Sequence, residues 1–231
     1  MNMECRDLVK LGVEIICPDI DSRGSSFILR EEGLIGTNWH VVHNPVNGVS
    51  SKNILAKLGD EENLPATIKV TDRRKDFAIL EVARSFSHVP ILGDYQSIEP
   101  YQEVYFVGRG LDLPALSLHR GWISAKTQKD SLDVLQIDGP INQGNSGGAV
   151  FDREGRVIGI VTQTEAKIDG ELIQLINEFQ QLQNSGMAIA FGGINILEVF
   201  KRQIYWLNRN RHVGIGYAFS NEYIRQALST L

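Results

Sequence analysis

The sequence predicts an all-β fold, either a sandwich or a barrel, and two observations on its first 165 or so residues predict it. Short runs rich in β-branched and aromatic residues follow one another, and Gly, Pro, Asn and Asp turn signals separate them. Their spacing of about 8–12 residues is typical of sandwiches and barrels and not of alternating strands and helices. The expected strands are 26–29, 34–37, 54–58, 66–70, 77–82, 103–107, 121–124, 134–137 and 156–161.

A helical pattern replaces the strand pattern over about 165–212. Within 172–182, apolar residues recur at the spacing of one face of an amphipathic helix. A second helix is expected from Asn195, whose side chain can cap it while Glu198 reaches back from the third helical position. A strand at 214–219 and a short helix at 221–228 are expected to follow. Earlier in the chain, the stretch 88–100 has no strong strand pattern and is expected to link two β units.

Composition excludes several classes of protein. The 231 residues carry a formal charge of −5 and a pI near 5.6, so no overall basic excess attracts nucleic acid or an acidic membrane. No segment approaches the roughly 20 apolar residues of a membrane span. Cys5 and Cys17 are the only cysteines, and the first seven residues contain no apolar run. Both points argue for a reducing compartment, and we expect a cytoplasmic protein in which the two thiols stay unpaired.

Three short segments contain the residues of a nucleophilic site, in the order His40, Asp76 and Ser146. Each lies at the end of an apolar strand or in a glycine-rich turn, where a rigid scaffold holds a reactive side chain. A serine hydroxyl needs a base to take its proton, and histidine, with an ordinary pKa of about 6.5, suits that role near neutral pH. A carboxylate on the other ring nitrogen selects the tautomer and stabilises the imidazolium.

The glycines around Ser146 suit a second task, the binding of an oxyanion. The anionic intermediate of acyl transfer needs backbone N–H groups that converge on one point. Gly144 allows a backbone conformation that is costly for residues with a Cβ atom, and the two glycines after Ser146 keep the backbone clear of a substrate. The expected oxyanion hole consists of Gly144, Asn145 and Ser146.

The segments 37–42, 76–80 and 144–148 together resemble the signature blocks of HtrA/Deg-type trypsin-like serine peptidases. The flanking runs 24–29, 121–125, 154–160 and 214–218 resemble that family in the same order. The resemblance implies a chymotrypsin-like pair of six-stranded β-barrels with the site in the cleft between them. His40 and Asp76 then belong to an N-terminal barrel over 1–92. Ser146 belongs to a C-terminal barrel over 93–231, which the helical insertion at about 165–212 interrupts.

The chain departs from the family pattern at several positions. Gln143 and Ala149 stand where the family usually has proline, and Asn145 stands where digestive zymogens have aspartate. We expect a peptidase without a PDZ domain, and these 231 residues contain no Ile-Val-Gly-Gly-like activation site. We therefore expect regulation by loop ordering or by a protein partner. The insertion is interpreted either as a packing element that covers a barrel face or as a lid or docking element for that partner.

The resemblance also suggests a specificity pocket. It places Pro140 and Ile141 near the base of the pocket and Ile160, Val161 and Thr162 along one wall. No acid lies there, so we expect a small or medium aliphatic residue before the scissile bond and not Lys or Arg.

Other residues of the sequence are weaker candidates for the same roles. His43 is a second candidate base, but the Asn-Pro that follows it suggests a loop, and Asp72 and Asp94 have weaker context than Asp76. No Cys/His cluster has the spacing of metal ligands, so neither metal nor cofactor is expected. The predicted function is a serine endopeptidase acting on peptides or proteins. The alternatives are a catalytically silent peptide-binding module and an esterase or acyltransferase with the same nucleophile.

Overall fold

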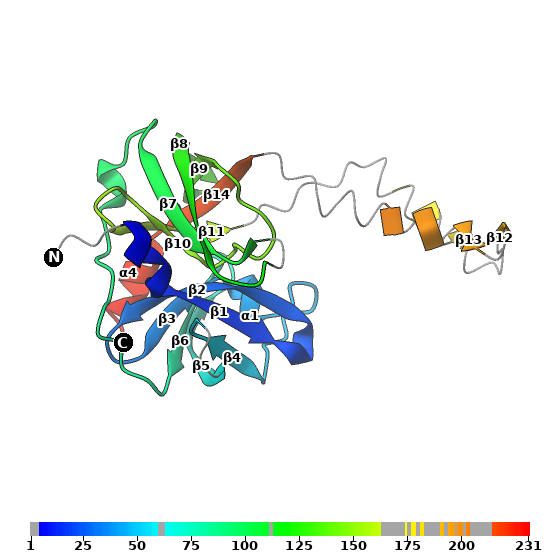
Figure 1. Ribbon diagram of the computed structural model, residues 1–231, viewed down its shortest axis with the longest axis horizontal. Helices are drawn as coiled ribbons and strands as arrows, with labels where there is room; N and C mark the ends of the chain where they lie inside the picture. Colours follow the sequence, from blue (N-terminus) through cyan, green and yellow to red (C-terminus); the bar gives the residue numbers. More distant parts are fainter. Residues whose placement is uncertain are drawn as a thin grey trace. The chain divides into compact units, whose positions relative to one another are not determined.

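The computed structural model describes residues 5–59, 63–110, 113–162 and 214–231, with 174, 177–178, 181–182, 190–191, 194–196, 198–200 and 202–203 between them. The chain divides into two compact units, one made of Met1–Gln163 with Gly214–Leu231 and the other of Thr164–Val213. The first unit contains two closed antiparallel barrels of six strands each (Figure 1). This result confirms the all-β, chymotrypsin-like double-barrel fold.

The first barrel has the strand order β1-β2-β3-β6-β5-β4. Its strands are β1 (Gly12–Cys17), β2 (Ser22–Arg30), β3 (Leu34–Thr37), β4 (Ile54–Lys57), β5 (Asn63–Asp72) and β6 (Phe77–Val82). The 3-10 helices η1 (Cys5–Leu11) and η2 (Pro18–Ile20) flank β1, and the one-turn helix α1 (Trp39–Val42) follows β3. β1 was not among the expected strands, because Glu14 interrupts its apolar residues, although five of its six residues are buried.

The second barrel has the strand order β10-β11-β14-β9-β8-β7. Its strands are β7 (Glu103–Gly108), β8 (Ser117–Lys129), β9 (Leu132–Asp138), β10 (Ala149–Phe151), β11 (Val157–Thr162) and β14 (Ile215–Ser220), and η3 (Tyr95–Ser97) and α4 (Glu222–Leu228) lie outside it. β11 and β14 pair from Gly159↔Ser220 to Thr162↔Tyr217, although the whole second unit separates them in sequence. The three-residue β10 was not expected, since it is too short to produce a periodic signal.

The hydrophobic core continues across the boundary between the barrels. One buried cluster fills the second barrel. The larger cluster fills the first barrel and also includes Val107 and Phe151 of the second barrel and Ile224 and Leu228 of α4. Fully burying one such side chain is worth about 1.5–3 kcal/mol, so these shared residues hold the two barrels in a fixed relation. A site built from both barrels therefore has a rigid support.

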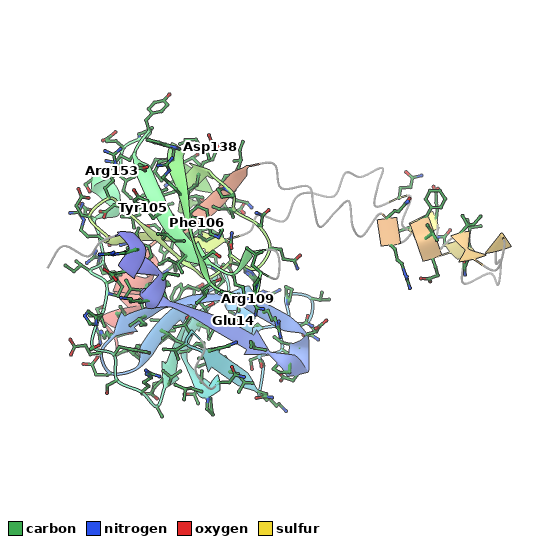
Figure 2. All side chains as sticks on the ribbon, viewed as in Figure 1. Glu14, Tyr105, Phe106, Arg109, Asp138 and Arg153 are labelled. Atoms are coloured by element: carbon green, nitrogen blue, oxygen red, sulfur yellow. The ribbon has the colours of Figure 1, made fainter. Side chains whose placement is uncertain are left out.

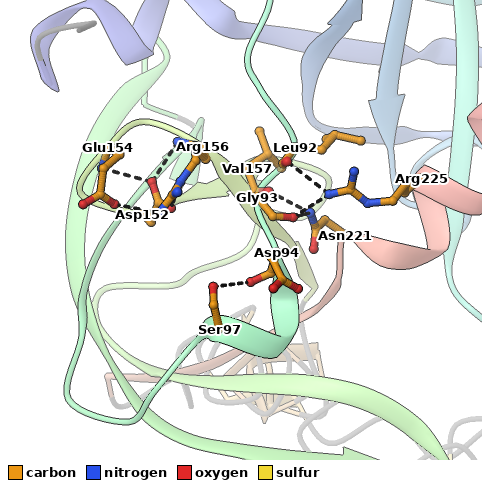
Figure 3. A network of polar contacts seen from close by, with 10 residues as sticks. All are labelled: Leu92, Gly93, Asp94, Ser97, Asp152, Glu154, Arg156, Val157, Asn221 and Arg225. Carbon is orange, nitrogen blue, oxygen red and sulfur yellow. Dashed lines mark hydrogen bonds and ion pairs between the residues drawn. The ribbon is translucent and has the colours of Figure 1, made fainter.

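The segment that links the barrels is held by the C-terminal helix and by the residue before it (Figure 3). Gly93 N–H donates to Val157 O at 2.7 Å, which adds the linker to the edge of β11. The buried Asn221 amide donates to both Gly93 O and Val157 O at 2.8 Å. Arg225 of α4 donates to Leu92 O at 3.0 Å and to Gly93 O at 2.6 Å. These bonds satisfy the linker carbonyls and anchor α4 at the same point.

The second unit contains the hairpin of β12 (Ala190–Phe191) and β13 (Ile194–Asn195). The Glu198 N–H donates to Asn195 Oδ1 at 3.4 Å, the capping contact that the sequence suggested. Most of the apolar stripe expected over 172–182 lies outside the described residues, and those described there are helical. Among the described residues, no helix has both the length and the hydropathy of a membrane span.

Candidate active site

His40 and Asp76 are brought together by the pairing of β3 with β6. Thr37, the last residue of β3, pairs with Ala78, so the residues after β3 lie beside the residue before β6. His40 Nδ1 lies 2.9 Å from Asp76 Oδ2 and 3.0 Å from Oδ1, and the His40 backbone N–H donates to Oδ1 at 3.1 Å. The carboxylate thus holds both the imidazole and the backbone that carries it, and Nε2 remains the nitrogen available for proton transfer.

The conformation of Asp76 is fixed by contacts from both barrels. Its φ of 47° is in the left-handed region, which Asp tolerates better than most residues. The Asn38 amide donates to the Asp76 carbonyl at 2.8 Å. From the second barrel, Thr162 Oγ1 donates to Asp76 Oδ2 at 3.0 Å. The carboxylate therefore accepts hydrogen bonds from three donors and has little freedom to rotate away from His40.

Ser146 follows a tight turn between β9 and β10. The Asn145 N–H donates to Asn142 O at 3.0 Å, and Gly144, the third residue of this turn, has a φ of 94°. A positive φ at that position is the mark of a type II turn. A type I turn would reverse the peptide between Gln143 and Gly144 and with it the direction of the Gly144 N–H. Gln143 occupies the second position, where proline would have fixed φ.

Gly24 is the point at which the His40 segment and the Ser146 segment meet. A Cβ atom on Gly24 would lie 2.6 Å from Val41 Cγ2 and 3.1 Å from the Ser146 carbonyl oxygen. Val41 directly follows His40, so Gly24 lies in contact with both the His40 segment and the Ser146 segment. Only a residue without a side chain allows this approach.

Gly147, directly after Ser146, is the tightest of these approaches. Its φ is 88°, and a Cβ atom there would lie 2.0 Å from Ser25 O and 2.3 Å from Thr37 Oγ1. We expect Gly147→Ala to lower the free energy of unfolding by about 3 kcal/mol, through backbone strain and overpacking together. Gly59→Ala is the matched control, because Gly59 has a φ of 58° but nothing lies within 4 Å of its added Cβ.

Urea unfolding measures both variants. Gly59→Ala should lose only about 1 kcal/mol, the cost of the left-handed backbone alone. Equal losses in the two variants would contradict the packing that the structure assigns to Gly147.

The four expected pocket residues, Ile141, Ile160, Val161 and Thr162, are all buried. Ile160 packs in the larger cluster, while Ile141 and Val161 pack in the cluster of the second barrel. The Thr162 hydroxyl contacts Asp76. The pocket itself stays a prediction.

The alternative candidates lie elsewhere. His43 is buried and stacks on Trp39 with ring centroids 4.6 Å apart, and its Nδ1 lies 3.1 Å from the Trp39 carbonyl oxygen. Asp72 accepts from the Lys75 N–H at 3.0 Å, and Asp94 caps η3. All three have structural contacts away from Ser146.

Other reactive groups are few within the part of the chain that the structure describes. Cys17 is a buried free cysteine, and burial raises the pKa of its thiol to about 11, so it is a poor nucleophile at neutral pH. No group of three or more His, Cys, Asp or Glu side chains among the described residues is placed to hold a metal ion.

Two residues beside the site have contacts that sequence reasoning missed. Ser25 holds the nucleophile turn, because its N–H donates to Ser146 O at 2.8 Å and its hydroxyl donates to Gly144 O at 2.7 Å. Thr162, which stays a predicted residue of the pocket wall, also donates to Asp76. These bonds join positions 119 and 86 residues apart, so no local pattern could have revealed them.

Comparison with known proteins shows the family to which the chain belongs. A family model described as "Trypsin-like peptidase domain" matches residues 24–160. A "Probable periplasmic serine endoprotease DegP-like" from Halomonas elongata is 37% identical over 155 residues, which are 64% of this chain and 31% of that protein. "Serine protease HTRA3" from Homo sapiens is 30% identical over 190 residues, 76% of this chain and 42% of the relative. The chain thus spans less than half the length of these relatives.

Solved structures share the fold. The HtrA-type protease AlgW with a tripeptide has a TM-score of 0.70 at 21% identity, covering 99% of this chain and 63% of that one. A serine endoprotease from Yersinia pestis has a TM-score of 0.64 at 20% identity, covering 100% of this chain and 67% of that one. At such identities the likeness supports the double barrel alone.

The expectation of a cytoplasmic protein is wrong, because several bacterial relatives are named periplasmic endoproteases. That expectation drew on the first residues and on the scarcity of cysteine. A chain that spans under a third of these relatives carries no information at its start about a leader. A core of this size also needs no disulfide to be stable in an oxidising compartment.

Family membership follows from the match of the family model, which covers more than half of the chain. The relatives at 30–37% identity are named DegP-like and HTRA serine proteases, as the resemblance of the three sequence blocks implied. The chain therefore belongs to the trypsin-like peptidase family, and within it to the HtrA/Deg type.

Proposed function

We propose that this protein is a serine endopeptidase that cleaves peptide bonds through an acyl-enzyme, with Ser146 as nucleophile, His40 as base and Asp76 as its orienting carboxylate. The observation that carries the proposal is the contact of His40 Nδ1 with both oxygens of Asp76, at 2.9 and 3.0 Å. Membership of the family implies peptide or protein substrates.

Acylation begins with attack of Ser146 Oγ on the carbonyl carbon of the scissile bond, while His40 Nε2 takes the hydroxyl proton. Asp76 stabilises the imidazolium that forms and keeps the remaining proton on Nδ1. His40 then gives its proton to the leaving amine, and an acyl-enzyme remains. Water, activated by His40, attacks the ester in the second half and releases Ser146.

The oxyanion formed in each half is proposed to lie against the N–H groups of Gly144 and Ser146, with Asn145 between them. Support comes from the type II turn at Asn142–Asn145, because the alternative turn would reverse the direction of the Gly144 N–H. One such donor is worth about 3–4 kcal/mol of transition-state stabilisation. A turn in which the Gly144 N–H points away from the oxyanion would therefore lower kcat by the corresponding factor.

A fluorophosphonate probe tests the function, because it reacts only with a serine activated by a base and an oxyanion hole. We expect the wild-type protein to be labelled at Ser146 and Ser146→Ala to remain unlabelled. Ser97→Ala is the matched control, since Ser97 is an exposed serine that donates to the Asp94 carbonyl at 2.8 Å and lies outside the proposed site (Figure 3). Ser97→Ala should be labelled at the wild-type rate.

The same experiment separates the alternative function. A folded wild-type protein that binds peptides but is never labelled, alone or with peptide ligands present, would favour a catalytically silent binding module. An increase in the labelling rate on addition of a peptide or protein would support regulation by loop ordering. We include in this proposal that such a partner docks on the segment 165–212. The proposal is supported by the division of the chain, in which Thr164–Val213 forms a unit of its own.

Substrate preference gives a second test. The residues proposed to line the pocket are buried and none of them is acidic, so a cationic side chain would find no carboxylate among them: Ile141, Ile160, Val161 and Thr162. We expect cleavage after Ala, Val or Leu to be at least about tenfold more efficient than cleavage after Lys or Arg. A peptide library analysed by mass spectrometry measures the ratio, and efficient cleavage after Arg with none after Val or Leu would refute the pocket.

A further inference from the structure

Resting on the proposed function, we propose that Ser25 and the ion pair of Glu14 with Arg109 position the oxyanion turn from outside the triad. In this view the first barrel holds, through one hydroxyl group, the peptide between Gly144 and Asn145, whose N–H closes the turn. The pair fixes that hydroxyl by fixing the backbone of Arg109. None of the three residues touches the substrate in this proposal.

Ser25 holds the turn on both sides of Asn145. Its N–H donates to the Ser146 carbonyl at 2.8 Å, and its hydroxyl donates to the Gly144 carbonyl at 2.7 Å. Ser25 is itself fully buried, and its own carbonyl accepts from Thr37 Oγ1 at 2.7 Å. A carbonyl and the next N–H belong to one rigid peptide plane, so fixing the Gly144 carbonyl also fixes the Asn145 N–H that closes the type II turn.

Arg109 completes the environment of this hydroxyl. Its backbone N–H donates to Ser25 Oγ at 3.0 Å, so that oxygen accepts from Arg109 while it donates to Gly144. The Arg109 carbonyl oxygen also lies where a side chain on Gly144 would be, 2.1 Å from the position of a Cβ atom. A shift of the Arg109 backbone would therefore change both the hydroxyl contact and the space open to Gly144.

The side chain of Arg109 explains why its backbone stays in place. Its Nη1 pairs with Glu14 Oε1 of β1, so the contact joins the second barrel to the first (Figure 2). Its Nε donates to Leu113 O at 2.5 Å. The two charged side chains are only 18% and 8% exposed, and Arg109 is thus anchored at a carboxylate and at a carbonyl. A charge pair with such low exposure is screened little by solvent and holds its geometry.

The experiment uses the whole chain and three variants: Ser25→Ala, Glu14→Gln and the double variant. For each, kcat and KM are measured on a peptide ester after titration of active sites. An oxyanion donor acts in the transition state, so kcat should fall and KM should change little. We expect a loss in kcat of about tenfold or more for Ser25→Ala and about fivefold for Glu14→Gln, since small misplacements of such groups are costly.

The double variant tests whether the ion pair acts through the hydroxyl. If it does, adding Glu14→Gln to Ser25→Ala should lower kcat by no more than about twofold, because interacting sites are not additive. Independent effects would multiply, to about fiftyfold in all, and would overturn this part of the inference.

Glu103→Gln is the matched control. Glu103 is a carboxylate on β7 that is 14% exposed and pairs with Arg120 at 3.4 Å and Arg153 at 3.3 Å, away from the turn. Its loss should lower the thermal midpoint as Glu14→Gln does and leave kcat per titrated site unchanged. A purely structural role of Glu14 would give the two variants the same kinetic result, and that outcome would overturn the inference.

Hydrogen exchange at the Asn145 amide separates this inference from the proposed function. The exchange follows the Asn145 N–H to Asn142 O bond of the turn and can be read on protein without activity. We expect exchange to accelerate about tenfold in Ser25→Ala and not in Glu103→Gln, as expected for loosening of one local element. Failure of the wild type to react with the fluorophosphonate, both alone and with peptide ligands present, would refute the proposed function, whereas unchanged exchange in Ser25→Ala would refute the role of Ser25.

Discussion

Replacing Ser146 or His40 by alanine is expected to lower the rate of peptide hydrolysis by about 10⁶-fold. Without Ser146 no acyl-enzyme forms, and without His40 the hydroxyl keeps its proton and remains a weak nucleophile. Because both side chains are proposed to act in the same step, the double variant should be no slower than either single variant. The residual rate would come from binding and from the oxyanion turn alone.

Single-turnover hydrolysis of a peptide ester measures these rates over the required range. His88→Ala is the matched control for His40→Ala. His88 is exposed, and its ring nitrogen Nδ1 lies 3.0 Å from the hydroxyl of the neighbouring Ser87. Its rate should equal that of the wild type, and all variants should keep the wild-type thermal midpoint within a few degrees. A loss of only a few-fold in Ser146→Ala would refute the triad.

The fold was predictable because its signals are local. Strands such as 77–82 follow the alternation or the continuous apolar runs that the core requires, and turn residues separate them. β1 and β10 were not predicted, the first because Glu14 interrupts its apolar residues and the second because it has only three residues. The closure into two barrels came from the resemblance of ordered blocks, since periodicity does not distinguish a barrel from a sandwich.

The environment of the site was less predictable than its candidate residues. His40, Asp76 and Ser146 each lie in a block with a recognisable pattern, whereas their supports do not. Thr162 reads as one more residue of a buried strand, and only the folded chain brings its hydroxyl to Asp76. Glu14 lies in β1, a strand that the sequence did not predict, and its partner Arg109 lies 95 residues away on the other barrel. Long-range contacts of this kind leave no mark in local sequence.

The role of Asp76 leads to the second large effect, a loss of about 10⁴-fold in kcat for Asp76→Asn. The carboxylate accepts from the His40 N–H, from His40 Nδ1 and from the Thr162 hydroxyl. An asparagine has one acceptor oxygen and one NH₂ group. If the oxygen keeps the His40 backbone N–H, the NH₂ group faces Nδ1 and donates to it.

That contact reverses the histidine tautomer. With Nδ1 accepting, the single proton of neutral His40 moves to Nε2, which then faces Ser146 as a donor and cannot take its proton. The packing changes little, because the two side chains have the same shape and the Thr162 hydroxyl can rotate to accept. Asp76→Asn should therefore lose activity with only a modest change in thermal midpoint.

Two measurements check this explanation, kcat on a peptide ester and the nitrogen chemical shifts of His40. Asp72→Asn is the control. Asp72 caps the turn before Asp76, where its carboxylate accepts from the Lys75 N–H and not from His40. It should keep the wild-type rate and the wild-type tautomer. A large loss of kcat in Asp76→Asn with the Nδ1 proton still in place would mean that the carboxylate acts by its charge alone. The geometry argues against that outcome, since both carboxylate oxygens lie within hydrogen-bond distance of Nδ1 and so define which nitrogen carries the proton.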